Sequence, residues 1–348
     1  MLTYIIKKLS YALLVMLGVV VLVNILFVSL GDPVKLVAGQ RTDKKTIDNI
    51  RKDLRMDSSA FISFLLYLND VSPIGTYTNT EIKDLSIKGI FVGNTQKWGI
   101  KLPYLRRSTQ TKKDVSSILL EALPGTILLA VTALIIASIF GILLGVLAAY
   151  KRHTWVDTTA VMSSIIGISA PSFFMGIVIA YVFGYVLHNY TGLNFAGSWL
   201  TAQPYQGSQL SIKNLILPAI TLGIRPLAII TQLTRSSMLD VLEQDYMRTA
   251  TAKGLSPKTI ILKHGLRNAL NPVITAITGW FAELLAGAFF VEYIFGWKGI
   301  GKVTVDALEK LDIPVVMGSV LLTALLFVLV NLLADVLYSV VDPRIKLQ

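Results

Sequence analysis

The chain has 348 residues, with 32 lysines and arginines against 21 aspartates and glutamates, giving a formal net charge of +11. Hydrophobic residues make up 53% of it and charged residues 15%, whereas soluble domains average about 25% charged residues. This composition excludes disordered and collagen-like chains and speaks against a soluble enzyme, and the lack of cysteine excludes disulfides, thiolate nucleophiles and iron–sulfur clusters.

Six apolar stretches predict membrane-spanning helices, each of which needs about 20 residues. They are Leu9–Gly31, Ala122–Tyr150, the part of Thr158–Ile212 before a Gly/Ser/Gln-rich stretch, Leu215–Thr234, Pro272–Val291 and Ile313–Val341. The first stretch is longer than the roughly 7–15 apolar residues of a signal peptide, so we expect it to be retained. The sequence thus predicts an all-α integral membrane protein with three parts: a first helix (1–31), a long segment (32–116) and a five-helix core (117–348).

The distribution of lysine and arginine among the short loops predicts the orientation. One side collects most of them, including Lys7 and Lys8, Lys151 and Arg152, and the basic residues of the segment 235–268. That side is expected to be cytoplasmic, with both termini inside and the segment 32–116 outside. Because the basic residues separate apolar blocks and form no basic face, we expect no nucleic acid partner.

The segment 32–116 is expected to be a small folded cap, with an unstructured loop as the alternative. Ala60–Leu68 is apolar but too short to span a membrane, which favours a partly buried helix. The four glycines at positions 75, 89, 93 and 99 are expected to mark turns around short apolar runs.

The long cytoplasmic segment 235–268 predicts a helix–turn–helix elbow. Tyr246–Lys253 favours a short helix, and Gly254 suits the left-handed position that follows a helix end. Ser256 is a good N-cap with Pro257 at the first helical position, so a second helix is expected to run from there into the fifth span.

This elbow carries apolar side chains that we expect to be exposed for a partner, at Tyr246, Met247, Leu255 and Ile261. The alternative is a plain solvated connector between two spans. Residues alone do not decide between these two interpretations.

The motif RTATAKGL at Arg248–Leu255 resembles the cytoplasmic coupling loop of bacterial ABC-importer permeases of the dipeptide/oligopeptide/nickel branch. Further motifs in the same order extend the resemblance over nearly the whole chain. They are LPGT (123–126), SAPSFF (169–174), LTRSSML (233–239), LRNALNP (266–272), VEYIFGWKGIG (291–301) and DVLYSVVDPRI (335–345). The segment 32–116 looks longer than is typical for this family.

The resemblance implies a non-catalytic permease subunit of the bacterial cytoplasmic membrane that moves di- or oligopeptides by alternating access. It implies a second homologous permease, two cytoplasmic ATPases that hold ATP and magnesium, and an external peptide-binding protein, which the segment 32–116 would help to receive. The chain itself would bind no cofactor. The residues expected to couple ATP hydrolysis to transport are Tyr246, Met247, Arg248, Thr249, Ala250, Ala252, Lys253, Gly254 and Leu255.

Nickel or another small cargo is the nearest alternative, since the resemblance implies that the separate binding protein largely chooses the cargo. A secondary transporter would need no ATPase, but it would more naturally show internal repeats, which we do not find. An exporter permease or a membrane assembly factor agrees less well with the coupling loop and the chain-wide motifs.

Two charged residues fall near the middle of predicted spans, Arg225 in the fourth and Glu283 in the fifth. A charge at that depth costs roughly 2.5–3.5 kcal/mol and usually faces a partner or a water path. We expect the two to pair along the translocation path, with a purely structural pair as the alternative. Pro171 is expected to kink or break the third span, beside the path or as an ordinary packing feature.

Other motifs do not indicate a site. GWKGIGK at 296–302 is close to a phosphate-binding loop, but Val303 replaces the required serine or threonine. The three histidines, His153, His188 and His264, lie far apart in the sequence, so no metal site is expected.

Overall fold

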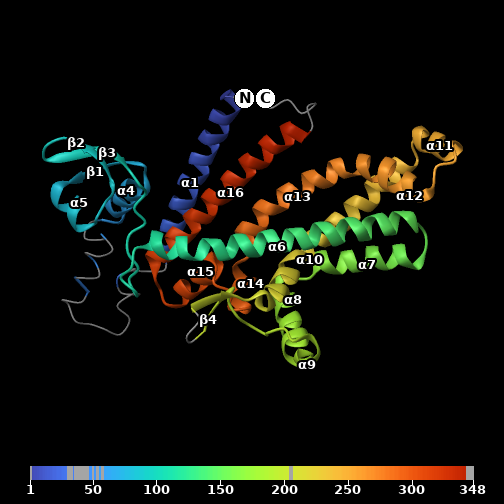
Figure 1. Ribbon diagram of the computed structural model, residues 1–348. Helices are drawn as coiled ribbons and strands as arrows, with labels where there is room; N and C mark the ends of the chain where they lie inside the picture. The colour runs from blue at the N-terminus through green and yellow to red at the C-terminus, as the bar shows by residue number, and fades with distance from the viewer. Residues whose placement is uncertain are drawn as a thin grey trace. The chain divides into compact units, whose positions relative to one another are not determined.

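The computed structural model describes residues 2–29, 34, 47–48, 51, 55, 59–203 and 207–341. These residues are mostly helical, as expected of a membrane permease, and they form two compact units. The first unit comprises Leu2–Leu123 and Val303–Leu325, and the second comprises Pro124–Lys302 and Leu326–Gln348. Two long helices, α6 (Val115–Tyr150) and α16 (Ile313–Val341), contribute to both units (Figure 1).

Within the described residues, four helical stretches are long and apolar enough to cross a membrane: α6, α10 (Ile212–Leu242), the stretch Pro257–Ala286, and α16 as far as Val336. The third of these consists of α12 (Pro257–Thr259), the π-helical η2 (Ile260–Leu266) and most of α13 (Arg267–Gly287). The first predicted span, Leu9–Gly31, falls in the continuous helix α1 (Leu2–Ser29) as far as Ser29, and its last two residues lie outside the described part of the chain. The count of six spans and the inside location of both termini remain predictions.

The third predicted span is not one straight helix. It is divided into α7 (Trp155–Ser169) and the pair α8 (Ser172–Ile179) and η1 (Ala180–Val186), which bend by 109° at the break. Pro171 lies in this break, and Ala170 before it has extended backbone angles (φ −75°, ψ 129°). A proline lacks the amide hydrogen that a helix needs and disfavours helical angles in the residue before it. The expected break at Pro171 is therefore confirmed.

The first unit contains a small sheet that the sequence did not predict. Three antiparallel strands occur in the order β1-β3-β2, with α5 (Asn79–Asp84) between β1 and β2 in the chain. The strands are β1 (Ile74–Thr78), β2 (Gly89–Val92) and β3 (Gln96–Lys101). The expectation of an all-α protein was therefore wrong for this part of the chain, whereas the expected short helix is confirmed as α4 (Ala60–Val71).

The glycines of this sheet explain why its strands were mistaken for turns. Gly75, Gly89 and Gly99 lie within strands, and only Gly93, with a φ of +130°, lies in a turn. A Cβ atom on Gly99 would collide with the carbonyl oxygen of Ile90 in the paired strand, so the strands approach too closely there for a side chain. Glycines inside strands this short hide the alternating pattern on which sequence prediction depends.

A buried aspartate holds this unit together. Asp70, at the end of α4, accepts hydrogen bonds from Arg55 Nη1 at 2.7 Å, Arg106 Nε at 3.0 Å and Tyr77 Oη at 3.1 Å. Its backbone carbonyl accepts from Lys101 Nζ at 2.5 Å, and burial lowers the pKa of that lysine to about 8. A buried charge is tolerated only when it is paired in this way.

In the second unit, α10 lies against α7, α8, α13 and α14 (Phe289–Ile294). Small residues let it approach α6 closely: Gly141 faces Ile230, and Gly145 faces Thr234. Other elements in the described part of the chain are α9 (His188–Thr191), the hairpin β4 (Leu200–Gln203) and β5 (Gly207–Leu210), α11 (Asp245–Ala252) and α15 (Ile300–Glu309).

Candidate functional site

The predicted elbow is present between α10 and α13. Its first arm is α11 and its second begins at α12 and continues through η2 (Figure 1). Ser256 caps the second arm, accepting a hydrogen bond from the Thr259 amide at 3.4 Å, and Pro257 occupies the first turn. The N-cap and proline assignments made from the sequence are confirmed.

The turn of the elbow is a Schellman motif built around Gly254. The Gly254 amide donates to the carbonyl of Thr251 at 3.0 Å, and the Leu255 amide donates to that of Ala250 at 3.4 Å. Gly254 has a φ of +76°, the left-handed conformation that glycine adopts at little cost. A Cβ atom at this position would meet nothing within 4 Å, so the backbone angle alone requires glycine.

Two of the expected coupling residues point inward. Met247 is 2% exposed and Ala250 is 7% exposed, on the α11 arm that lies against η2. The expectation that Met247 is an exposed docking side chain was therefore wrong, and Ile261 is also partly buried. These residues fix α11 on the second arm.

The other expected coupling residues form the outer surface of the elbow: Tyr246, Arg248, Thr249, Ala252, Lys253, Gly254 and Leu255 are all exposed. Tyr246 accepts a hydrogen bond at its hydroxyl from Asn268 Nδ2 at 2.9 Å, which ties α11 to the first turn of α13. Arg248 lies 3.7 Å from Asp245, and both side chains are largely in solvent. The elbow thus presents polar and apolar side chains outward on a rigid turn.

The structure brings together the two charges expected near mid-span, although Glu283 lies in the last turns of α13 whereas Arg225 lies near the middle of α10. Arg225 Nη1 lies 3.9 Å from Glu283 Oε1, and both side chains are about half exposed, at 56% and 55%. The Arg225 guanidinium also lies 5.8 Å from the centre of the Trp280 ring, within the range of a cation–π contact. The predicted pairing across α10 and α13 is therefore observed, whereas Pro171 belongs to the separate break between α7 and α8.

Sequence reasoning missed a buried carboxylate next to these helices. Glu292 of α14 is fully buried, and it accepts hydrogen bonds from Thr126 Oγ1 at 2.7 Å, the Gly301 amide at 2.7 Å and the Lys302 amide at 3.2 Å. Burial raises the pKa of Glu292 to about 7, against the opposing effect of these hydrogen bonds.

The glycine-rich turn after α14 is shaped to close over this carboxylate. A Cβ atom on Gly299 would collide with the Glu292 carboxylate, and one on Gly125 would collide with the Lys298 carbonyl. The buried Trp297 donates from its ring nitrogen to the Gly125 carbonyl at 2.9 Å. Two motifs far apart in the sequence, LPGT and GWKGIG, therefore meet around the buried Glu292. In the sequence, the glycines of these motifs are the signal that could have indicated this site.

A second missed contact lies where α10 leads to the elbow. Arg235 donates to both carboxylate oxygens of Asp157, from Nε at 2.5 Å and from Nη2 at 2.8 Å. Asp157 lies in the first turn of α7 and also accepts from the His153 amide at 3.1 Å. Such two-pronged pairs are geometrically specific, so the start of α7 is fixed to the end of α10.

Comparisons with known proteins identify the family. Residues 141–347 match the family model "Binding-protein-dependent transport system inner membrane component", and residues 1–84 match the model for the N-terminal part of such components. The glutathione transport system permease protein GsiC of Escherichia coli K12 is 34% identical over 99% of both chains.

GsiC of Salmonella choleraesuis is 35% identical, again over 99% of both chains. A solved amino acid ABC transporter aligns with a TM-score of 0.47 at 14% identity, covering 66% of this chain and 95% of that one. The two family models together cover both ends of the chain, and the curated relatives cover nearly all of it. The chain therefore belongs to the inner membrane components of binding-protein-dependent transport systems, as a multi-pass permease subunit of a bacterial ABC importer of the dipeptide/oligopeptide/nickel type.

Proposed function

We propose that this permease moves di- or oligopeptides into the cell by alternating access, driven by two ATPases that dock on the α11–α12 elbow. The single observation that carries the docking proposal is the elbow itself, a rigid helix–glycine–helix turn with its own packing complete at Met247 and Ala250. Arg248, Thr249 and Ala252 of α11 are exposed on the surface of the elbow, where a partner could contact them.

The cargo proposal is supported by the relatives, which are named for glutathione transport. Glutathione is a short peptide, so this name agrees with a peptide cargo. Nickel or another small cargo remains the alternative, which a transport assay with the purified binding protein would distinguish.

The path proposal is supported by Arg225 and Glu283. Two opposite charges on neighbouring apolar helices that are half exposed in one subunit require a surrounding of water or of a second subunit. A cavity between two permeases supplies both. We therefore propose that this pair, and the broken helix at Pro171, line the cavity between this chain and a second homologous permease.

The first experiment is purification of the tagged chain from its native membrane in mild detergent, with identification of everything that accompanies it. Recovery of a second permease and of ATPases with magnesium-dependent ATP hydrolysis is the expected result. Recovery of the intact chain alone, under conditions that preserve known ABC complexes, would contradict the proposal.

The second experiment uses the absence of native cysteine. Thr249→Cys and Ala252→Cys place single thiols on the outer surface of α11, and Thr154→Cys places a matched exposed thiol in the turn between α6 and α7. Added ATPase subunits are expected to slow maleimide labelling at the first two positions and not at the third. Equal labelling rates at all three positions, with the ATPases bound, would refute docking on the elbow.

A further inference from the structure

The sheet of the first unit has an apolar face turned away from its own core. The inward face holds Tyr77, Phe91 and Lys101, which contact each other or the end of α4. Side chains alternate along a strand, so the residues between these point to the opposite face. The strand register places two cross-strand rows there: Ile74, Ile100 and Ile90, then Thr76, Trp98 and Val92.

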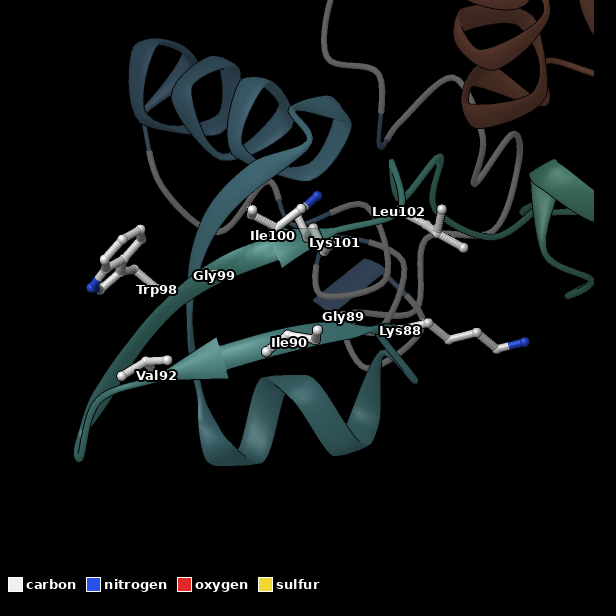
Figure 2. A pocket seen from close by; sticks show the side chains of 9 residues that line it. All are labelled: Lys88, Gly89, Ile90, Val92, Trp98, Gly99, Ile100, Lys101 and Leu102. Atoms are coloured by element: carbon white, nitrogen blue, oxygen red, sulfur yellow. The ribbon is translucent and has the colours of Figure 1, made fainter.

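These outward side chains are large and uncovered. Ile90 is 80% exposed, Ile100 68% and Trp98 60%, and Ile74, Val92 and Leu102 are similarly open. Figure 2 shows Trp98 and Ile100 along β3 beside Val92 and Ile90 along β2, where they line a shallow pocket with Lys88 at one end. A contiguous apolar patch of this kind marks an interaction surface.

The packing of α4 indicates the depth at which this patch lies. In the first unit, Tyr67 of α4 is buried with Val20 and Val23 of α1 and with Ile313 and Met317 at the start of α16. Ile313 is the first residue of α16 and of the predicted sixth span, so this cluster marks the outer end of that span. We infer that α4, the helix next to the sheet in the first unit, packs against α1 near the outer membrane interface.

Other side chains of α4 agree with that depth. Phe61 is 69% exposed, and Ile62 and Leu65 are 47% and 46% exposed, so α4 presents apolar residues beyond those that it buries against α1. An apolar helix surface beside a membrane span is normally covered by lipid. The sheet patch and this helix surface belong to the same unit.

We propose that the apolar face of the β1-β3-β2 sheet rests in the lipid interface of the membrane. Tryptophan prefers the headgroup level, where the ring is in an apolar environment and its N–H reaches water, and lysine extends its charge to the lipid phosphates. Trp98 and Lys88 supply these two groups, and the isoleucines supply the apolar area. Among the described strands, β2 lies at the edge of the sheet and pairs with β3 alone, and an open sheet edge does not occur in the hydrocarbon centre, so the face is restricted to the interface.

The test is spin-label depth measurement on the full-length chain in vesicles of phosphatidylethanolamine and phosphatidylglycerol. Ile90→Cys and Ile100→Cys place labels on the patch, and Asp84→Cys places a matched control on exposed α5. Collisions with oxygen, which concentrates in lipid, are compared with collisions with a water-soluble nickel chelate. The patch labels are expected to favour oxygen several-fold over the control label.

A label-free measurement accompanies it. Quenching of tryptophan fluorescence by brominated lipid is compared between the native chain and Trp98→Phe, and the native chain is expected to be quenched more.

Three results would overturn the proposal. Patch labels as accessible to nickel as the Asp84 control would show that the face is in water. Protection that occurs only when the external binding protein is added would assign the face to that protein. Dipolar coupling between labels on two chains would assign it to a second copy.

Discussion

Gly254 determines the direction in which the two arms of the elbow leave the turn. Its φ of +76° costs an L-residue about 1–2 kcal/mol, and a β-branched residue more, whereas asparagine tolerates this region better than most. No side chain crowds the position, so substitutions there test the backbone conformation alone.

Gly254→Val is therefore expected to lower substrate uptake per ATP hydrolysed while leaving membrane insertion intact. Gly254→Asn is the matched control and should retain most of the coupling. Both rates are measured in proteoliposomes that contain the complete transporter. Uptake at the native rate in the valine variant would contradict the role of the elbow.

Ala250 shows why burial must be known before a coupling residue is tested. The sequence suggests Ala250→Asp as a substitution that would disturb docking, but Ala250 is buried. The aspartate would place an unpaired carboxylate in the packing of the elbow, so a loss of activity would report folding as well as docking. Exposed Thr249 and Ala252 are the better positions.

Glu292 gives the folded chain a predictable dependence on pH. Its pKa is raised to about 7 from 4.5, so between these values the native state binds more protons than the unfolded state. Stability therefore falls as the pH rises through this window and becomes constant above it. The midpoint of thermal unfolding in detergent should be higher at pH 5 than at pH 8 through this contribution.

Glu292→Gln removes the titration while keeping an oxygen to accept from the Gly301 and Lys302 amides. The variant should lose this part of the pH dependence, measured as the difference between the unfolding midpoints at pH 5 and pH 8. The same difference in both proteins would show that Glu292 does not titrate in this range.

At the scale of elements, α10 and α13 meet at Arg225 and Glu283. A pair at 3.9 Å with both side chains about half exposed contributes about 0–1 kcal/mol to stability, because solvent screens it. Stability alone therefore gives little reason for two charges at this depth. The proposed role in the translocation path would supply such a reason.

Arg225→Gln and Glu283→Gln are each expected to insert and fold with little change in unfolding midpoint but to slow uptake. Arg107→Gln is the control. It removes one member of the Arg107–Asp114 ion pair of the first unit, whose two side chains are exposed to a similar extent. Native uptake rates in both neutralised variants would exclude the pair from the path.

The elements were predictable from sequence where their signals were long or chemically specific. Uncharged stretches predicted the long helices. Gly254, Ser256 and Pro257 predicted the elbow with nearly the observed helix bounds. The sheet was not predictable, because Gly75, Gly89 and Gly99 interrupt strands of four to six residues. Contacts such as Glu292 with Thr126 join residues far apart in the chain, which periodicity cannot detect.

At the scale of the whole molecule, the sheet of the first unit is joined to its membrane helices by a small polar contact. Asp312, directly before α16, accepts from Ser108 Oγ at 2.5 Å and from the Thr109 amide and hydroxyl at 3.0 and 3.2 Å. Ser108 and Thr109 lie between β3 and α6. Asp312 is 4% exposed, so loss of its carboxylate leaves buried donors without an acceptor.

Asp312→Ala is expected to loosen the connection between β3 and α6, at a cost of about 1–3 kcal/mol for the unsatisfied groups. Limited proteolysis should then cut residues 102–114 roughly 5–140 times faster, since about 1.4 kcal/mol corresponds to a tenfold change in an equilibrium. Asp312→Asn keeps one acceptor oxygen for the Thr109 amide. Its cleavage rate at 102–114 should therefore lie between those of the native chain and of Asp312→Ala. If cleavage at 102–114 is unchanged while the elbow at α11 is cut equally in all three proteins, the first unit is held together there by the apolar packing of α4 with α1 and α16. In that case the proposed lipid contact of the sheet's outer face would contribute more to the position of the sheet than the hydrogen bonds of Asp312.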